Sequence, residues 1–203
     1  MSATCYIVGA GEFYGELNLS DGDIVIAADG GYDTLRELGV TPDLLVGDMD
    51  SVKAVPTDIE KLRVPVEKDE TDTYLCYLEG VRRGYSNFVI LGGVGGREDH
   101  TFANYSLLIG AIKQGHRVKL VSEHFDIFAI FSENLEIKSK KNHALSLFAF
   151  GECASGVSIA GCKYEAEGIT LTPSFPLGVS NLVTSDTASV SVECGTLLIM
   201  LER

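Results

Sequence analysis

Four short segments of the chain place carboxylates where a buried strand gives way to a loop or a helix. They are residues 27–31 (AADGG), 46–51 (VGDMDS), 68–73 (KDETDT) and 91–100 (LGGVGGREDH). Acids gathered at the carboxyl ends of strands, beside a glycine-rich loop able to hold phosphate, are typical of divalent-metal sites for phosphoryl transfer. The four segments therefore predict metal-assisted phosphate chemistry.

The pair Asp48 and Asp50 has the spacing of a metal site. Two residues apart in an extended loop, the carboxylates can present oxygens on one side, and Mg²⁺ takes one or two carboxylates together with water and phosphate oxygens. Each acidic segment also has a purely structural interpretation. A lone Asp-x-Asp can be a turn, Asp29 before two glycines can form an Asx-turn, and Thr71 or Asp72 can cap the following helix.

The glycine-rich loop is more informative. Gly93, Gly95 and Gly96 remove side chains where backbone N–H groups must approach an anion, and Arg97 adds a bidentate donor for phosphate. A helix expected from about Asp99 adds the positive end of its dipole. The Gly-Lys-Ser/Thr ending of a Walker A loop is missing. A glycine-rich turn that binds no ligand is the alternative, and His100 is given no acid–base role.

Composition excludes several function classes. The formal charge is −13, and residues 1–100 hold 19 of the 29 acids but 8 of the 16 bases. Such a chain has no basic patch for nucleic acid, and it requires cations between itself and ATP. No apolar run reaches the ~18 to 20 residues of a membrane span, and the N-terminus does not resemble a signal peptide. Five cysteines without CxxC spacing argue against a disulfide framework or a zinc site, so we expect a cytoplasmic protein.

Apolar patterning predicts an α/β domain followed by a β domain. Strands are expected at residues 5–8, 24–28, 44–46, 88–91 and 118–121, and helices at 32–38, 73–83 and 101–114; the short segment 64–66 is a further candidate strand. This alternation predicts a mainly parallel, Rossmann-like sheet covered on both faces. From residue 133 onward the pattern predicts an antiparallel β-sandwich, with strands at 135–139, 144–150, 157–160, 169–172, 189–193 and 196–201. The predicted domains are 1–132 and 133–203, joined at residues 132–134.

The predicted sheet brings the acidic segments to one edge. Ligands of open parallel sheets bind outside the carboxyl ends of the strands, near the point where strand order reverses. Asp29, the Asp48/Asp50 pair and residues 92–97 each follow a predicted strand. Asp69 and Asp72 join them if residues 64–66 form a strand.

The order of these motifs resembles the thiamine pyrophosphokinase family. The resemblance rests on the four segments, with 42–51 read as PDLLVGDMDS, and on GVSN at 178–181 and GTLL at 195–198. It implies transfer of a diphosphate from ATP to the hydroxyl of thiamine with release of AMP. It also implies Mg²⁺ and a homodimer.

The resemblance also implies roles by position. Asp48, Asp50 and Asp72 match the acids around metal and diphosphate, with Asp69 and Asp29 as supporters. Asp29, Gly30, Gly93, Gly95, Gly96, Arg97 and Asp99 match the nucleotide side, and Asp72, Arg97 and Asp50 are the candidate catalytic residues. Ser180 and Asn181, together with Asp72, match the thiamine side, in a pocket shared between subunits.

The chain departs from the family pattern at three points. Glu98 stands where an aromatic residue is frequent, Tyr164 is followed by Glu165 and Ala166 in place of a Pro-Leu pair, and there is no tryptophan. Two other function classes use similar residues. A metal-dependent phosphohydrolase would release phosphate without an acceptor, and a nucleotide-binding sensor would bind ATP without turnover.

Overall fold

The computed structural model describes residues 3–50, 52–53, 57–65 and 69–203. The chain divides into two compact units. The first comprises residues 1–107 and 115–123, and the second comprises residues 108–114 and 124–203.

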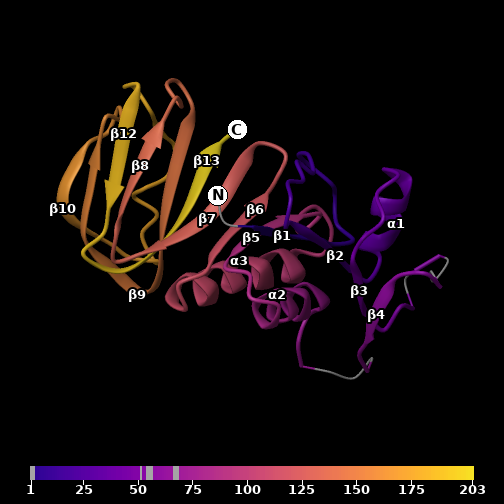
Figure 1. Cartoon of the computed structure of the whole chain (residues 1–203). Coiled ribbons are helices and arrows are strands. Elements are labelled where there is room, and N and C mark those ends of the chain that lie inside the picture. The colour runs from indigo at the N-terminus through magenta and orange to yellow at the C-terminus, as the bar shows by residue number, and fades with distance from the viewer. Residues whose placement is uncertain (1–2, 51, 54–56, 66–68) are drawn as a thin grey trace. The chain divides into compact units, whose positions relative to one another are not determined.

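The first unit is a parallel sheet whose strand order reverses once (Figure 1). Its strands are β1 (Thr4–Val8), β2 (Ile24–Ala28), β3 (Leu44–Gly47), β4 (Glu60–Arg63), β5 (Asn87–Leu91) and β6 (Arg117–Val121). They lie in the order β4-β3-β2-β1-β5-β6, and every neighbouring pair is parallel. The chain adds strands outward from β1 to β4 and then returns to the other side of β1 for β5. The reversal therefore falls between β1 and β5.

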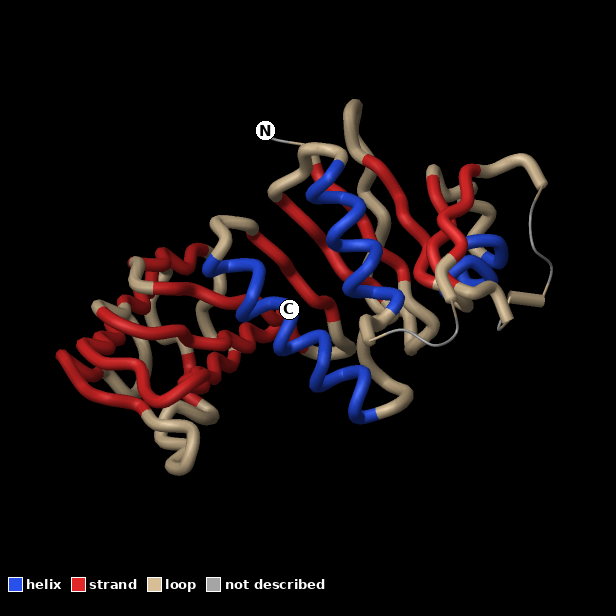
Figure 2. The backbone as a smooth tube through the Cα atoms, turned by 90° about the horizontal axis from the view of Figure 1, so that it is seen from below, coloured by secondary structure: helices blue, strands red, loops and turns tan. Residues whose placement is uncertain are grey.

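Helices cover both faces of this sheet because its strands are apolar on both sides. The helices are α1 (Gly31–Glu37), α2 (Asp72–Arg82) and α3 (Glu98–Lys113). Leu35 of α1 packs in one cluster with Val8 and Ala27. Gly80 of α2 lies against Cys5 and Phe88 on the opposite face, where no side chain larger than hydrogen fits. Figure 2 shows α2 and the first turns of α3 side by side on that face. Within the described residues, no helix has both the length and the apolar character needed to cross a membrane.

The second unit is antiparallel. Its strands are β7 (Phe125–Phe131), β8 (Asn134–Lys138), β9 (Ala144–Ala160), β10 (Ala166–Leu171), β11 (Asn181–Leu182), β12 (Thr187–Ser191) and β13 (Cys194–Glu202). The long strand β9 joins two sets of pairings: its first half pairs with β13 and β11, and its second half pairs with β12 and β10. Apolar residues from both sets form one core, which includes Leu147, Val157 and Leu197.

The predicted fold class is confirmed, and most elements lie where the sequence placed them. Gly39 and Gly84, which follow the first two helices, have φ of 71° and 92°, the left-handed conformation that commonly ends a helix. The fourth strand is the main correction: it is β4, Glu60–Arg63, which ends before residue 64, and residue 66 of the candidate segment lies outside the described part. All four β4 residues are exposed at the sheet edge, so the strand carries no buried apolar run to reveal it.

The sequence prediction also left out one long strand. β7 pairs along its whole length with β13 in the second unit. Apart from residues 108–114, the second unit begins at His124, and residues 132 and 133 form the turn from β7 to β8. Two predicted strands, 144–150 and 157–160, belong to the single strand β9.

Candidate functional site

Three carboxylates meet at the carboxyl ends of β2 and β3. Asp29, Asp48 and Asp50 each offer an oxygen, and these oxygens lie within 4.8 Å of one another. Asp29 and Asp48 are half-buried, whereas Asp50 is exposed. The cluster therefore opens toward solvent at the edge where the sequence predicted it.

The backbone around the cluster is held in unusual conformations. Asp29 has φ of 44°, and Met49, between the two other acids, has φ of 68°. Met49 is buried to 6% exposure in the apolar cluster beneath, and Asp48 accepts a hydrogen bond from the Asp50 N–H over 3.0 Å. A left-handed residue at a non-glycine position is costly and is retained mainly where surrounding structure requires it. Here the left-handed conformation directs the Met49 side chain into the core, while the carboxylates of Asp48 and Asp50 remain close to that of Asp29.

Neighbouring residues shape the cluster further. Gly47 has φ of 152°, and a β-carbon there would lie 2.9 Å from Cβ of Asp29. Asp33 of α1 is buried and accepts a hydrogen bond from the Lys53 N–H over 3.1 Å, so α1 anchors the loop that follows β3.

The donor set fits a hard divalent cation. All three side chains are carboxylates, without a sulfur or imidazole donor among them. Mg²⁺ prefers oxygen ligands and is commonly bound by a few carboxylates and substrate phosphates. Three negative charges this close also repel one another, which an ion between them would relieve.

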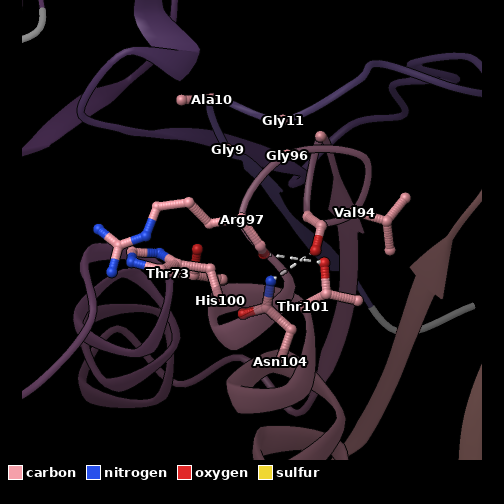
Figure 3. A pocket seen from close by; sticks show the side chains of 12 residues that line it. Gly9, Ala10, Gly11, Thr73, Val94, Gly96, Arg97, His100, Thr101 and Asn104 are labelled. Carbon is pink, nitrogen blue, oxygen red and sulfur yellow. Dashed lines mark hydrogen bonds between the residues drawn. The ribbon is translucent and has the colours of Figure 1, made fainter.

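A pocket of about 320 Å³ lies beside the strand-order reversal. The Gly9–Gly11 backbone forms one wall, and His100, Thr101 and Asn104 of α3 form another (Figure 3). Since β1 and β5 are the strands on either side of the reversal, their following loops frame the crevice where open α/β sheets bind ligands.

The two loops are joined by their backbones. The N–H groups of Gly9, Gly11 and Glu12 donate to the carbonyl oxygens of Leu91, Gly92 and Val94, over 2.8, 2.9 and 2.8 Å. A β-carbon at Gly11 would lie 2.3 Å from the Val94 carbonyl oxygen, and one at Gly92 would lie 2.4 Å from that of Gly9. Some of the glycines are therefore required by backbone contact.

The glycines predicted to hold phosphate differ in their surroundings. A β-carbon at Gly93 would strike Leu120 and Ile90, at 2.6 and 2.7 Å. Gly95 has φ of 71° and lies against Glu12, while Gly96 has open space around its α-carbon. Gly93 and Gly96 line the pocket, and Gly96 is the one that leaves space for a ligand.

Arg97 and Asp99 form a two-point ion pair at the pocket. Nε of Arg97 lies 3.1 Å from Oδ1 of Asp99, and an Nη atom lies 2.6 Å from Oδ2. The guanidinium lowers the pKa of Asp99, and the carboxylate raises the pKa of Arg97. Both side chains are largely exposed. Arg97 is therefore held as a permanent cation at the rim of the pocket.

The remaining predicted residues of this unit lie around the same edge. Thr71 caps α2 by accepting a hydrogen bond from the Tyr74 N–H over 3.2 Å, as one interpretation of this segment predicted. Asp72 is the first residue of α2 and precedes Thr73, which lines the pocket. Among the described residues, Asp72 and Asp69 are not in the close group with Asp29. Gly30 is the N-cap of the short helix α1.

In the second unit, Ser180 and Asn181 lie in different environments. Ser180 is exposed, with φ of 60°, and its N–H donates to Oγ of Ser146 over 3.0 Å. Asn181 is 6% exposed, and its side chain bonds to the backbone of Tyr164. The Tyr164 ring is exposed, with the Lys163 ammonium 5.1 Å from its centroid. Of the two predicted thiamine-side residues, Ser180 is accessible and Asn181 is structural to its loop.

Sequence reasoning missed several residues of the site. Gly9 and Gly11 follow a predicted strand as Gly-x-Gly, a signal that was available. Asn104 follows His100 and Thr101 at helical spacing, so it shares their face of α3. The buried Asp33 has no comparable signal, because its role depends on the fold of a distant loop.

Two family models match the chain. Residues 16–120 match the family model described as "Thiamin pyrophosphokinase, catalytic domain". Residues 133–198 match "Thiamin pyrophosphokinase, vitamin B1 binding domain". Together the two models cover most of the chain.

Individual relatives agree as well. The chain is 26% identical over 187 residues to thiamine pyrophosphokinase of Bacillus subtilis, covering 86% of this chain and 85% of that protein. It is 27% identical over 157 residues to thiamin pyrophosphokinase 1 of Caenorhabditis elegans, covering 71% and 63%.

Solved structures show the same fold. The Bacillus subtilis enzyme matches with a TM-score of 0.88 at 24% identity, over 99% of both chains. Thiamin pyrophosphokinase from Candida albicans matches with a TM-score of 0.77 at 15% identity, over 99% of this chain and 89% of that one. With both of its family models matched in order, the chain belongs to the thiamin pyrophosphokinase family.

Proposed function

We propose that the chain transfers the diphosphate of ATP to the hydroxyl of thiamine, giving thiamine diphosphate and AMP, at the edge formed by the acidic cluster and the glycine-walled pocket. The observation that carries this proposal is that the acidic cluster and the pocket lie at the same edge of the sheet. The three carboxylates follow β2 and β3, and the glycine-walled pocket is lined by the loops that follow β1 and β5, the next two strands of the same parallel sheet. The family membership of the chain supplies the reaction.

The acidic cluster supports Mg²⁺ as the cofactor. We assign Asp48, Asp50 and Asp29 to hold the ion, and this proposal gives Asp29 a more direct role than the supporting one inferred from sequence. When bound, the ion would neutralise charge on the ATP phosphates. The left-handed turn at Met49 and the missing side chain at Gly47 keep the carboxylates in position, so they are preorganised for binding the ion.

The pocket supports nucleotide binding by the first unit. Gly93 and Gly96 present backbone to the space, and Arg97 provides a cation that can move from Asp99 to a phosphate. Asp99 holds Arg97 in its ion pair, Gly95 shapes the same loop, and Gly30 follows Asp29 as the N-cap of α1. Asp72, next to pocket-lining Thr73, is the carboxylate we assign to accept the hydroxyl proton, and Asp69 lies three residues before it.

Features of the second unit support a role in binding thiamine, the acceptor of the diphosphate. We assign residues 1–132 to ATP and Mg²⁺, and residues 133–203 to thiamine and dimerisation; the catalytic-domain model matches within the first range and the vitamin B1 binding model within the second. An exposed apolar loop favours a homodimer whose thiamine pocket is shared between subunits. Phe175, Leu177 and Val179 on this loop are 65%, 56% and 41% exposed.

Product analysis tests the proposal. The protein is incubated with ATP and Mg²⁺, with and without thiamine, and nucleotides and thiamine esters are separated. We expect AMP to appear only when thiamine is present, in amounts equal to thiamine diphosphate. Phosphate release without thiamine would indicate a phosphohydrolase, and ATP binding without AMP would indicate a sensor; either result overturns the proposal.

A further inference from the structure

The last residue of β5 and the first three residues of the loop after it carry four consecutive carbonyl groups, each of which accepts a hydrogen bond from a specific donor. Three of them, at Leu91, Gly92 and Val94, accept hydrogen bonds from backbone N–H groups of residues 9–12. The fourth, at Gly93, accepts from Nδ2 of Asn104 over 2.7 Å (Figure 3). The Gly93 carbonyl is therefore the member of this series that depends on a side chain.

Asn104 is built into the wall of the pocket. It lies on α3, lines the pocket, and is 4% exposed. A β-carbon at Gly93 would lie 3.1 Å from Nδ2 of Asn104, so the amide packs closely against the glycine that it binds. A buried amide is costly unless it is hydrogen-bonded, so its direction is set by this contact.

Holding a carbonyl also sets the direction of the next N–H group. The Gly93–Val94 peptide is trans, and in a planar trans peptide the C=O and the following N–H point in opposite directions. With the carbonyl bound toward Asn104, the Val94 N–H points away from α3. If the peptide rotated, a carbonyl oxygen would replace the N–H and would repel an anion.

We propose that Asn104 is a positioning residue for the nucleotide: its amide fixes the Gly93–Val94 peptide so that the loop presents N–H groups to the phosphates of a nucleoside triphosphate. The three backbone bonds hold the flanking peptides, and Asn104 holds the peptide that glycine would otherwise leave free to rotate. This inference rests on the proposed function, because it takes the pocket as the nucleotide site.

Binding measurements on variants test the inference. The dissociation constant of ATP with Mg²⁺ is measured by calorimetry for the wild type, Asn104→Ala and Asn104→Asp, and the KM for thiamine is measured in parallel. Ser106→Ala is the matched control, since it removes a side-chain-to-backbone bond of the same helix, from Ser106 Oγ to the Phe102 carbonyl, on an exposed face.

We expect Asn104→Ala to weaken ATP binding about tenfold, the loss that corresponds to one hydrogen bond. The KM for thiamine should change less than about twofold, and Ser106→Ala should bind ATP as the wild type does. If Asn104 had only a structural role, its variants would have a lower melting temperature, and ATP binding would not be weakened more than the KM for thiamine is raised. An ATP dissociation constant of both Asn104 variants equal to that of the wild type would overturn the inference.

The aspartate variant gives a second test that does not depend on the alanine variant folding. Its carboxylate cannot donate to the Gly93 carbonyl, whereas its protonated form can, and burial favours protonation. We expect the ATP-binding defect, relative to wild type at the same pH, to shrink as the pH falls from about 8 to about 6. A defect that is the same at both pH values contradicts a donor role. If the wild-type protein does not bind ATP, the proposed function is wrong. If the wild type binds ATP and both Asn104 variants bind it equally well, only the inference about Asn104 is wrong.

Discussion

Asn181 pairs with the backbone of Tyr164 as a neighbouring strand would. Its Nδ2 donates to the Tyr164 carbonyl oxygen over 2.7 Å, and its Oδ1 accepts from the Tyr164 N–H over 3.0 Å. The same Oδ1 also accepts from the Leu182 N–H over 2.9 Å. The amide is thus committed to holding the 161–165 loop beside Ser180, the exposed member of the Ser-Asn pair.

Replacing Asn181 by alanine should therefore affect stability and thiamine use together. The Tyr164 N–H and C=O lose their partner, which costs about 1–3 kcal/mol of unfolding free energy. Because the loop beside Ser180 is released, we expect the KM for thiamine to rise while the KM for ATP stays near the wild-type value. Steady-state kinetics and urea denaturation measure both. Thr184→Val, which removes a single bond to the Gly161 carbonyl, is the control. An equal rise in both KM values would contradict the assignment.

Asp50→Asn should abolish activity without lowering the stability of the fold. The substitution removes one of three crowded carboxylates, so Mg²⁺-dependent turnover should be abolished. Without Mg²⁺, the melting temperature should stay the same or rise, because like-charge repulsion is reduced. Asp21→Asn is the control, since Asp21 precedes β2 and lies at the opposite edge of the sheet. Full activity of Asp50→Asn would place the metal site elsewhere.

Arg97→Ala should lower kcat by a factor on the order of 10² to 10³, the usual cost of losing one charge-stabilising donor. Asp99→Asn retains the guanidinium and removes its carboxylate partner, so it should reduce activity far less. The melting temperatures of both variants should be close to that of the wild type, because the pair is exposed. Near-normal turnover by Arg97→Ala would refute its role at the phosphates.

Glu79 should make stability depend on pH in the acid range. Its hydrogen bonds with Arg82, together with those of Arg83, lower its pKa from 4.5 to about 2. A lowered pKa stabilises the folded state above pH 4.5, and this contribution is lost as the pH falls toward about 2. Glu79→Gln should cost on the order of 2 kcal/mol at pH 7, and the difference from wild type should narrow at pH 3.

Urea denaturation at the two pH values measures the effect of Glu79. Glu136→Gln is a suitable control, since Glu136 makes an exposed ion pair with Lys138 and should change stability little. A difference between wild type and Glu79→Gln that is constant with pH would show that the ion pairs of Glu79 do not stabilise the fold.

The sequence predicted at which edge of the sheet the acidic residues lie, but it did not predict the contacts that they make there. Asp48 and Asp50 could be placed because each directly follows a short buried apolar run, and such runs end at one edge of a parallel sheet. Asp29 joins them closely because Gly47 has no side chain, a packing relationship that spacing alone does not reveal. β4 was misplaced for the opposite reason, since an exposed edge strand carries polar residues.

The glycine-rich loop shows a second limit of sequence reasoning. Gly92 and Gly93 look like positions for an anion, yet each is also required by close packing, against Gly9 and against Leu120. A glycine required by another backbone and one required by a ligand look alike in sequence. The contacts of Asn104 and Gly9 could not be predicted, even though their spacing was visible in the sequence, because those contacts depend on which loop lies opposite, and strand order decides that.

The central claim is that the chain transfers a diphosphate group intact, and the fate of the β-phosphorus of ATP tests it most directly. The protein is supplied with Mg²⁺, thiamine and ATP labelled at the β-phosphorus, and the label is followed into separated products. We predict that the label appears in thiamine diphosphate and that unlabelled AMP forms in equal amount. Label recovered in ADP, or in free phosphate or diphosphate with no thiamine ester, would contradict the account.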